Sequence, residues 1–154
     1  MAIQTDIIVG FPGETEAQFE NTLKLLAEIE FDVVHVAAYS PRPGTPAAEY
    51  PGQLPLEEKK RRLHRVEELQ RRIASEKNAR YLGRRVEVLV EGQAKGKWYG
   101  RTRTNKIVHV ASDLDLGGKL IEAEIVQTSP WSLQGTLVAI EAPRAQPEPL
   151  PVLA

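Results

Sequence analysis

The chain has 154 residues, a formal net charge of −1 and no cysteine. This length is typical of one or two small domains, and the near-zero charge excludes a global attraction to nucleic acid, so any basic surface must be local. The absence of cysteine excludes disulfides, thiolate metal sites and a cysteine nucleophile within these residues. No apolar run reaches membrane-spanning length and no signal-peptide pattern is present, which predicts a soluble, cytoplasmic protein.

The first segment has the pattern of strand, turn, helix and strand. Residues 7–9 form a continuous apolar run, which is typical of a strand buried on both faces. Glycine and proline at 10–13 predict a tight turn, and Thr15 with Gln18 three positions later is a capping-box signature. Apolar residues at helical spacing follow, and 31–39 predicts a second strand. Such a βαβ unit requires a parallel sheet, in which chemistry gathers at the carboxyl ends of the strands.

Two segments of contrasting composition come next. Residues 40–55 are rich in proline and glycine, and we expect no regular structure there. A rigid connector is the favoured interpretation, and a site loop that presents Tyr39, Ser40 and Arg42 to a ligand is the alternative. Residues 56–80 predict a long charged helix with one narrow apolar stripe. Its charged face is best explained by ion pairs at i, i+4 spacing, with a phosphate-contacting surface as the alternative. The stripe consists of Leu63, Val66, Leu69 and Ile73.

From residue 84 the apolar period changes from helical to two, which predicts strands. Turn residues separate five expected strands, and this pattern favours a small barrel of the OB-like class. Residues 142–154 are rich in proline without periodicity, which predicts a disordered tail. The five strands are expected at 85–91, 97–103, 107–111, 121–125 and 133–140.

The first half of this barrel is locally basic. Its cations face only Glu87 and Glu91, whereas the fourth strand is acidic. Trp98 and Tyr99 add aromatic surfaces beside the charges, a combination typical of modules that bind unpaired bases. An ordinary polar surface with Trp98 in the core is an equally open interpretation. The basic residues are Arg84, Arg85, Lys95, Lys97, Arg101, Arg103 and Lys106.

No catalytic group of residues can be argued from the pattern. The three histidines lack metal-ligand spacing, and we expect His35 to be a satisfied core residue in a buried strand. Glu14 is expected to complement a helix N-terminus rather than to act as a base. No Ser/His/Asp set, phosphate loop or carboxylate pair is visible, so no catalytic or metal-binding residue is predicted.

Motifs along the chain form one combined pattern up to Ile140. Thr-Asp-Ile-Ile-Val-Gly-Phe-Pro-Gly-Glu-Thr at 5–15 and Tyr-Ser-Pro-Arg-Pro-Gly-Thr-Pro-Ala at 39–47 are its most distinctive parts. Together the motifs resemble the radical S-adenosylmethionine methylthiotransferase family, with the fifth and sixth barrel strands, the linker helix and the TRAM domain in that order. The remaining matching residues are 31–38, which lead into the second motif, and Lys60, Arg62, Leu63, 69–70, Gly83, 88–92, 100–102, 105–106, 132–133 and Gly135.

The resemblance implies an α/β plus all-β fold. Residues 1–55 would be the carboxyl-terminal piece of a radical S-adenosylmethionine (β/α) partial barrel, 56–82 a linker helix and 83–141 a five-stranded OB-like TRAM barrel. The Arg-Pro-Gly-Thr loop and the Gly-Arg-Thr before Asn-Lys are similar to the tRNA-modifying branch. That branch adds a methylthio group to isopentenyladenosine next to the anticodon. The threonylcarbamoyladenosine branch is its closest rival.

The resemblance also implies roles for single residues. The tRNA anticodon stem-loop is the implied partner, and a monomer is expected. The family uses S-adenosylmethionine and two 4Fe–4S clusters held by cysteines that this chain lacks, so we expect the chain alone to be inactive. Cofactor contacts are implied for Val9, Gly10, Phe11, Pro12, Tyr39, Ser40 and Arg42. RNA contacts are implied for Arg101, Thr102, Asn105 and Lys106, to which local basicity adds Lys97 and Arg103.

Three hypotheses follow from the sequence. The first is the carboxyl-terminal part of a tRNA methylthiotransferase, begun inside a larger barrel because one βαβ unit cannot close a sheet. The second is a free-standing RNA-binding module that uses the helix as a spacer. The third is a protein-interaction domain that docks through the exposed edge of an incomplete sheet.

Overall fold

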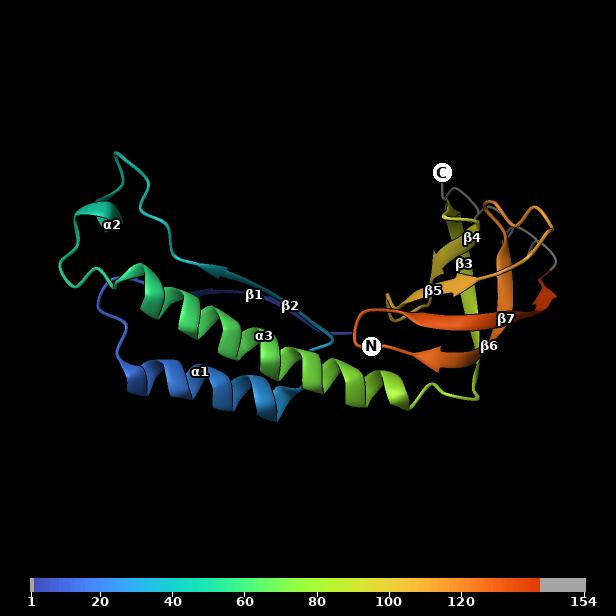
Figure 1. The fold of residues 1–154 in the computed structure, drawn as a ribbon, viewed down its shortest axis with the longest axis horizontal. Helices are drawn as coiled ribbons and strands as arrows, with labels where there is room; N and C mark the ends of the chain where they lie inside the picture. Colours follow the sequence, from blue (N-terminus) through green and yellow to red (C-terminus); the bar gives the residue numbers. More distant parts are fainter. Residues whose placement is uncertain (1, 142–154) are drawn as a thin grey trace, which may run out of the picture. The chain divides into compact units, whose positions relative to one another are not determined.

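A computed structural model describes residues 2–141 of the chain (Figure 1). The chain divides into two compact units. The first runs to Leu82 and includes Thr128–Ser132, and the second comprises Gly83–Gln127 with the residues from Leu133 on. The tail predicted at 142–154 lies outside the described residues. Within residues 2–141, no helix is both long enough and apolar enough to cross a bilayer.

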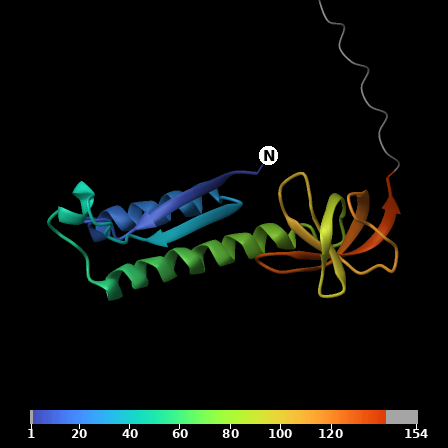
Figure 2. The ribbon, with the colours of Figure 1, turned by 90° about the horizontal axis from the view of Figure 1, so that it is seen from above.

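The first unit contains a two-stranded parallel sheet, whose strands lie side by side in Figures 1 and 2. Ile7 pairs with Val36 in its register. The core lies between this sheet and the two long helices, where Val9, Phe19 and Val66 are fully buried. The elements are β1 (Gln4–Val9), α1 (Glu16–Ile29), β2 (Val33–Ala38), the short α2 (Pro46–Glu49) and α3 (Leu56–Ala79).

Within residues 2–141, one face of this sheet is covered by helices and the other is not. Ile8 is 61% exposed, and His35 and Ala37 are exposed beside it. The prediction of a first strand buried on both faces is therefore wrong, and so is the prediction of His35 as a core residue. Residues alternate in direction along a strand, so helices packed on one face leave every second side chain in solvent.

Local signals set the start of α1 as the sequence predicts. Thr15 caps the helix, and its hydroxyl accepts a hydrogen bond from the amide of Gln18 while the Gln18 side chain accepts one from the amide of Thr15. The loop after β2 differs from its prediction because it contains α2. Proline is compatible with the first helical position, and Pro46 occupies it.

α3 buries a mixed face rather than a purely apolar stripe. Val66, Ile73 and Ala74 are buried as expected for the side that packs on the sheet. The same side also buries Lys59 and Arg62. Glutamates elsewhere in the first unit, described below, explain the burial of Arg62, whereas Lys59 packs over Gly10 and beside the Tyr39 ring.

The second unit is a closed five-stranded barrel with strand order β3-β4-β5-β7-β6, which confirms the predicted OB-like class. β3 pairs antiparallel with β4 and with β6, β4 pairs antiparallel with β5, and β5 pairs parallel with β7. β3 extends beyond its predicted end through an irregularity between Val90 and Gly92, and β4 stops before the predicted residue 103. The bounds are β3 (Arg85–Ala94), β4 (Lys97–Arg101), β5 (Ile107–Val110), β6 (Leu120–Thr128) and β7 (Leu133–Ile140).

Close approach of two strands constrains the barrel at Gly100. A Cβ added there would lie 2.2 Å from the carbonyl oxygen of Leu89 and 2.8 Å from Cα of Val90. Both obstacles are backbone atoms, so a side chain could be accommodated only by separating β3 from β4.

We expect Gly100→Ala to destabilise the barrel by about 1–3 kcal/mol or more, because the methyl group forces apart two paired strands. Urea unfolding followed through amide exchange of residues 85–140 measures this. Gly117→Ala is the matched control, since its Cβ would come no closer than 3.4 Å to a neighbour outside the adjacent residues. Equal unfolding free energies for the two variants would contradict the constraint.

Candidate functional site

The two strands of the first unit end together. The amide of Tyr39 donates to the carbonyl of Val9 at 2.8 Å, which continues the β1–β2 pairing by one residue. Phe11 then stands edge-to-face to Tyr39 with ring centroids 5.1 Å apart. Tyr50 also lies edge-to-face to Phe11, with ring centroids 6.2 Å apart. An aromatic cluster therefore covers the carboxyl ends of the strands, where a parallel sheet presents its ligands.

A hollow of about 410 Å³ opens on the uncovered side of the sheet at these strand ends. It unites Tyr39, Ser40 and Arg42, three of the residues for which cofactor contacts are implied. The other four, Val9, Gly10, Phe11 and Pro12, do not line this hollow. Of these, Val9 and Gly10 are buried. Its size is within the range of small-molecule sites. The lining is completed by Ile8, Ala37, Ala38, Thr45 and Ala47.

One buried ion pair holds the turn after β1 against α3. The guanidinium of Arg62 donates through Nη1 to both the carboxylate Oε2 and the backbone carbonyl of Glu14, at 2.7 and 3.0 Å. The Arg62 side chain is only 5% exposed. The same Glu14 oxygen accepts the amide of Gly10 at 2.6 Å. The prediction that Glu14 complements a helix terminus misses this role, because its partner lies 48 residues away.

Glu58 extends this network along α3. Its Oε1 accepts hydrogen bonds from Nε of Arg62 at 2.6 Å and from Nη2 of Arg61 at 2.7 Å. Hydrogen bonds from Arg61 and then Arg62 lower the pKa of Glu58 to about 2, because they stabilise its ionised form. Reciprocally, Glu58 and Glu16 raise the pKa of Arg61 above its ordinary value.

Lys59 lies above the strand ends. Its stem crosses Gly10, whose added Cβ would lie 2.6 Å from Cγ of Lys59. Its Nζ lies 5.0 Å from the centroid of the Tyr39 ring. Gly10 has a φ of 73°, so it supplies both the turn and the space that the lysine needs.

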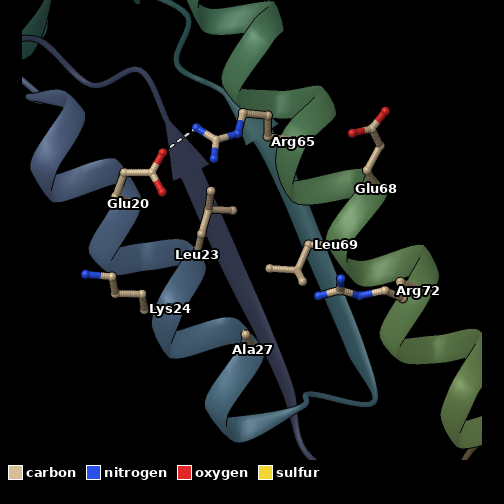
Figure 3. A pocket seen from close by; sticks show the side chains of 8 residues that line it. All are labelled: Glu20, Leu23, Lys24, Ala27, Arg65, Glu68, Leu69 and Arg72. Carbon is tan, nitrogen blue, oxygen red and sulfur yellow. Dashed lines mark hydrogen bonds and ion pairs between the residues drawn. The ribbon is translucent and has the colours of Figure 1, made fainter.

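A second hollow, of about 530 Å³, lies between α1 and α3 (Figure 3). Leu23, Ala27 and Leu69 form its apolar part, and an ion pair from Arg65 to Glu20 crosses one end. The hydrogen bond from Arg65 lowers the pKa of Glu20. None of the predicted site residues lines this groove.

On the barrel, the structure separates the predicted RNA-binding residues into three groups. Arg101 and Arg103 project outward and pair with Glu91 at 3.3 Å and Glu87 at 2.6 Å, the two acidic residues of that region. Lys97 donates to the Gln134 side chain at 3.1 Å.

The third group builds the turn between β4 and β5. The Thr102 hydroxyl accepts the amide of Lys106 at 3.1 Å, and Asn105 adopts a φ of 61° and accepts from Nη1 of Arg101. Lys106 is only 8% exposed, whereas a lysine that contacts the RNA backbone must be accessible to solvent.

A hollow of about 340 Å³ lies between the two outward arginines. Leu89 and Leu120 form its apolar part, and Leu89 is 51% exposed. Guanidinium planes beside an apolar floor can hold an unpaired base by stacking while their charges contact phosphate.

Trp98 does not form the exposed aromatic surface for bases that the sequence suggests. Trp98 is half-buried, and its indole nitrogen donates to the carbonyl of Ser112 at 3.2 Å, which gives it a structural role. Trp131, in the first unit, is the exposed tryptophan. Leu89 could have been found from the sequence, because it is an apolar residue at an outward position between Val88 and Val90. The burial of Lys59 has no local signal in the sequence, because it depends on packing against Gly10, which is distant along the chain.

Comparison with known proteins gives consistent matches. The family model described as TRAM domain matches residues 79–138. A Chloroflexus aurantiacus protein named tRNA-2-methylthio-N(6)-dimethylallyladenosine synthase is 53% identical over 88% of this chain and 30% of its own length. Proteins of the same name from Dehalococcoides mccartyi and Roseiflexus are each 51% identical, over 91% and 89% of this chain and 34% and 30% of their own lengths. The chain thus spans about a third of the length of these curated relatives.

We expect Arg62→Met to destabilise the first unit by about 3–5 kcal/mol, because it leaves the Glu14 carboxylate without its buried partner. Amide exchange of residues 4–79 in increasing urea gives the unfolding free energy. Arg72→Met on the exposed side of α3 is the control and should remain within about 0.5 kcal/mol. A similar destabilisation of both variants would argue against the pair.

The low pKa of Glu58 predicts that its contribution to the stability of the fold is lost in acid. A carboxyl with a depressed folded-state pKa stabilises the fold above its unfolded value, 4.5, and loses this effect as pH falls toward about 2. The stability difference between the chain and Glu58→Gln should therefore shrink across that interval. Unfolding free energies measured at several pH values provide the test, with the more exposed Glu57→Gln as control. Parallel pH profiles for the chain and Glu58→Gln would refute it.

Proposed function

We propose that this chain, which belongs to the radical S-adenosylmethionine methylthiotransferase family and carries a TRAM domain, binds tRNA through its barrel. One observation carries this proposal: the residues that match the TRAM model form a closed barrel. On that barrel, the outward Arg101 and Arg103 flank a hollow with an apolar floor. The anticodon stem-loop is the proposed target, and the chain is proposed to act as a monomer in the cytoplasm.

The proposed binding mode combines charge with stacking. Phosphate contacts from guanidinium groups provide sequence-independent affinity that weakens with salt. Leu89 and the arginine planes would hold one unpaired base in the hollow. Because Glu87 and Glu91 already pair with these arginines, the RNA phosphates must compete with carboxylates. This competition favours RNA geometries that engage both arginines at once.

We further propose that the chain takes part in the reaction that its relatives' name describes, the 2-methylthiolation of N6-dimethylallyladenosine in tRNA. The hollow at the strand ends fits part of S-adenosylmethionine: Ile8 and Ala37 offer apolar contact, and the Tyr39 hydroxyl is buried without a hydrogen-bond partner among residues 2–141. Tyr39, Ser40 and Arg42 would hold the cofactor there. When bound, S-adenosylmethionine supplies the radical chemistry of the family.

The iron–sulfur clusters of the family do not fit these residues. The chain has no cysteine. Among residues 2–141, no group of three or more His, Asp or Glu side chains could hold a metal ion. Thiolates normally ligate such clusters, so the ligands must come from outside these 154 residues.

We expect the double variant Arg101→Ala and Arg103→Ala to weaken binding of an anticodon stem-loop RNA and to reduce the slope of log affinity against log salt by about two, one for each phosphate that is no longer neutralised. Fluorescence anisotropy over a salt series measures both quantities. Arg71→Ala with Arg72→Ala removes the same charge from α3 and is the matched control. Equally weakened binding by the two double variants would show that net charge, rather than the barrel surface, binds the RNA.

A further inference from the structure

The apolar hollow on the barrel is lined by two carboxylates as well as by two arginines. Glu87 and Glu91 belong to its lining together with Arg101, Arg103 and Leu89. The arginines suit contact with phosphate, whereas a carboxylate repels phosphate and needs a different partner. A carboxylate only accepts hydrogen bonds, so this partner must be a donor of the RNA, either a ribose 2′-hydroxyl or an N–H group on the edge of a base.

The strand register places these groups around one apolar floor. Leu89 of β3 lies opposite Arg101 of β4 and also opposite Leu120 of β6. Directly opposite side chains share one face of a sheet, so the two leucines lie side by side there. Glu87 and Glu91 lie two positions before and two positions after Leu89 along β3, and both line the same hollow. A flat base that covers Leu89 would therefore meet a carboxylate at its edge.

Glu91 is the carboxylate that has more capacity to accept a ligand. It lies within the irregularity of β3, where the pairing with β4 shifts, and a bulge of this kind re-aims a side chain. Among residues 2–141, its hydrogen-bond donor is Nε of Arg101, which lies 3.3 Å from Oε1 and 3.4 Å from Oε2. One N–H shared at these distances leaves most lone pairs of the carboxylate available. Glu87, by contrast, is held at 2.6 Å by Nε of Arg103, and its side chain is 21% exposed against 40% for Glu91.

The donor pattern of the bases then selects one of the four. Guanine presents two adjacent donors on its Watson–Crick edge, N1–H and the exocyclic N2 amino group, which match the two oxygens of a carboxylate. Adenine and cytosine each present one amino group beside a ring nitrogen that is an acceptor. Uracil presents one N–H between two carbonyl groups. Each of these three bases would therefore turn at least one lone pair toward the carboxylate, which is repulsive.

We propose that the barrel hollow is selective for an unpaired guanine, whose Watson–Crick edge donates to the Glu91 carboxylate while its ring covers Leu89. The guanine must be unpaired because the edge that Glu91 contacts is the edge used in base pairing. The arginines of the hollow contact the phosphates of the same strand, so charge supplies affinity and the carboxylate supplies base selectivity. Selectivity for guanine rests on the proposed function, that the barrel binds RNA.

The test compares short oligouridine RNAs that carry guanosine, inosine, adenosine or uridine at one central position. Inosine lacks only the N2 amino group of guanosine, so it removes one of the two hydrogen bonds and keeps the fused ring. We expect the full chain to bind the guanosine RNA roughly tenfold more tightly than each of the other three, because a hydrogen bond to a charged group is lost in every case. Fluorescence anisotropy measures the four affinities. Equal affinities for the guanosine and inosine RNAs would overturn the proposal.

Two variants identify the carboxylate. Glu91→Gln should abolish the preference for guanosine over inosine, because the amide turns an N–H donor toward one of the donors of guanine. Glu124→Gln removes the same charge from β6, outside the hollow, and should keep the preference. A preference that persists in Glu91→Gln, or that disappears in both variants, would contradict the assignment to Glu91. The comparison of guanosine with inosine uses the unaltered chain, so it remains decisive even where a variant fails to fold.

Further outcomes separate this proposal from the proposed function. If the Arg101→Ala and Arg103→Ala double variant loses RNA affinity while the unaltered chain binds all four RNAs equally, the barrel binds RNA without reading a base, and only the guanine site is refuted. If the double variant binds every RNA as tightly as the unaltered chain does, the proposed function itself fails. If a 2′-deoxy substitution at the central position lowers affinity while exchange of the base does not, Glu91 accepts from ribose and the guanine assignment is wrong.

Discussion

The buried pair between Arg62 and Glu14 is the interaction on which the first unit depends. Two strands alone do not form a stable sheet, and the described core beneath them is small. A guanidinium that donates to both the carboxylate and the backbone carbonyl of Glu14 ties the turn after β1 to α3. The Glu14 carboxylate in turn accepts a hydrogen bond from the amide of Gly10, so the same side chain also fixes the end of β1.

The second unit is constrained differently. Its core consists of aliphatic side chains that alternate along the strands, and closure of the barrel leaves no long free edge among the strands of residues 85–140. The closest approach is between backbones, where Gly100 meets Leu89. A steric condition of this kind is independent of pH and salt, whereas the ion pairs of the first unit respond to both.

The elements could be predicted from the sequence because their signals are local. Thr15 and Gln18 cap a helix within one turn, and the alternation from residue 85 specifies strands whatever surrounds them. Burial could not be predicted in the same way. Whether Ile8 faces solvent depends on how many layers cover the sheet, and Arg62 is buried because of a glutamate that is 48 positions away. For the candidate sites, residue types were predictable, but their accessibility, as for Lys106, was not.

Counting charges along the sequence overstates the positive field of both units. Arg101 and Arg103 have glutamate partners, and so do the exposed cations at the start of α3. A paired arginine exposes less net charge than its position in a basic segment suggests, so its contribution to RNA binding depends on geometry rather than on attraction at a distance. Lys59 is the opposite case, because it is hidden from solvent and yet has no carboxylate within ion-pair distance among residues 2–141. The pairing state of each cation, and not the number of cations, therefore determines how much positive charge each unit presents to solvent.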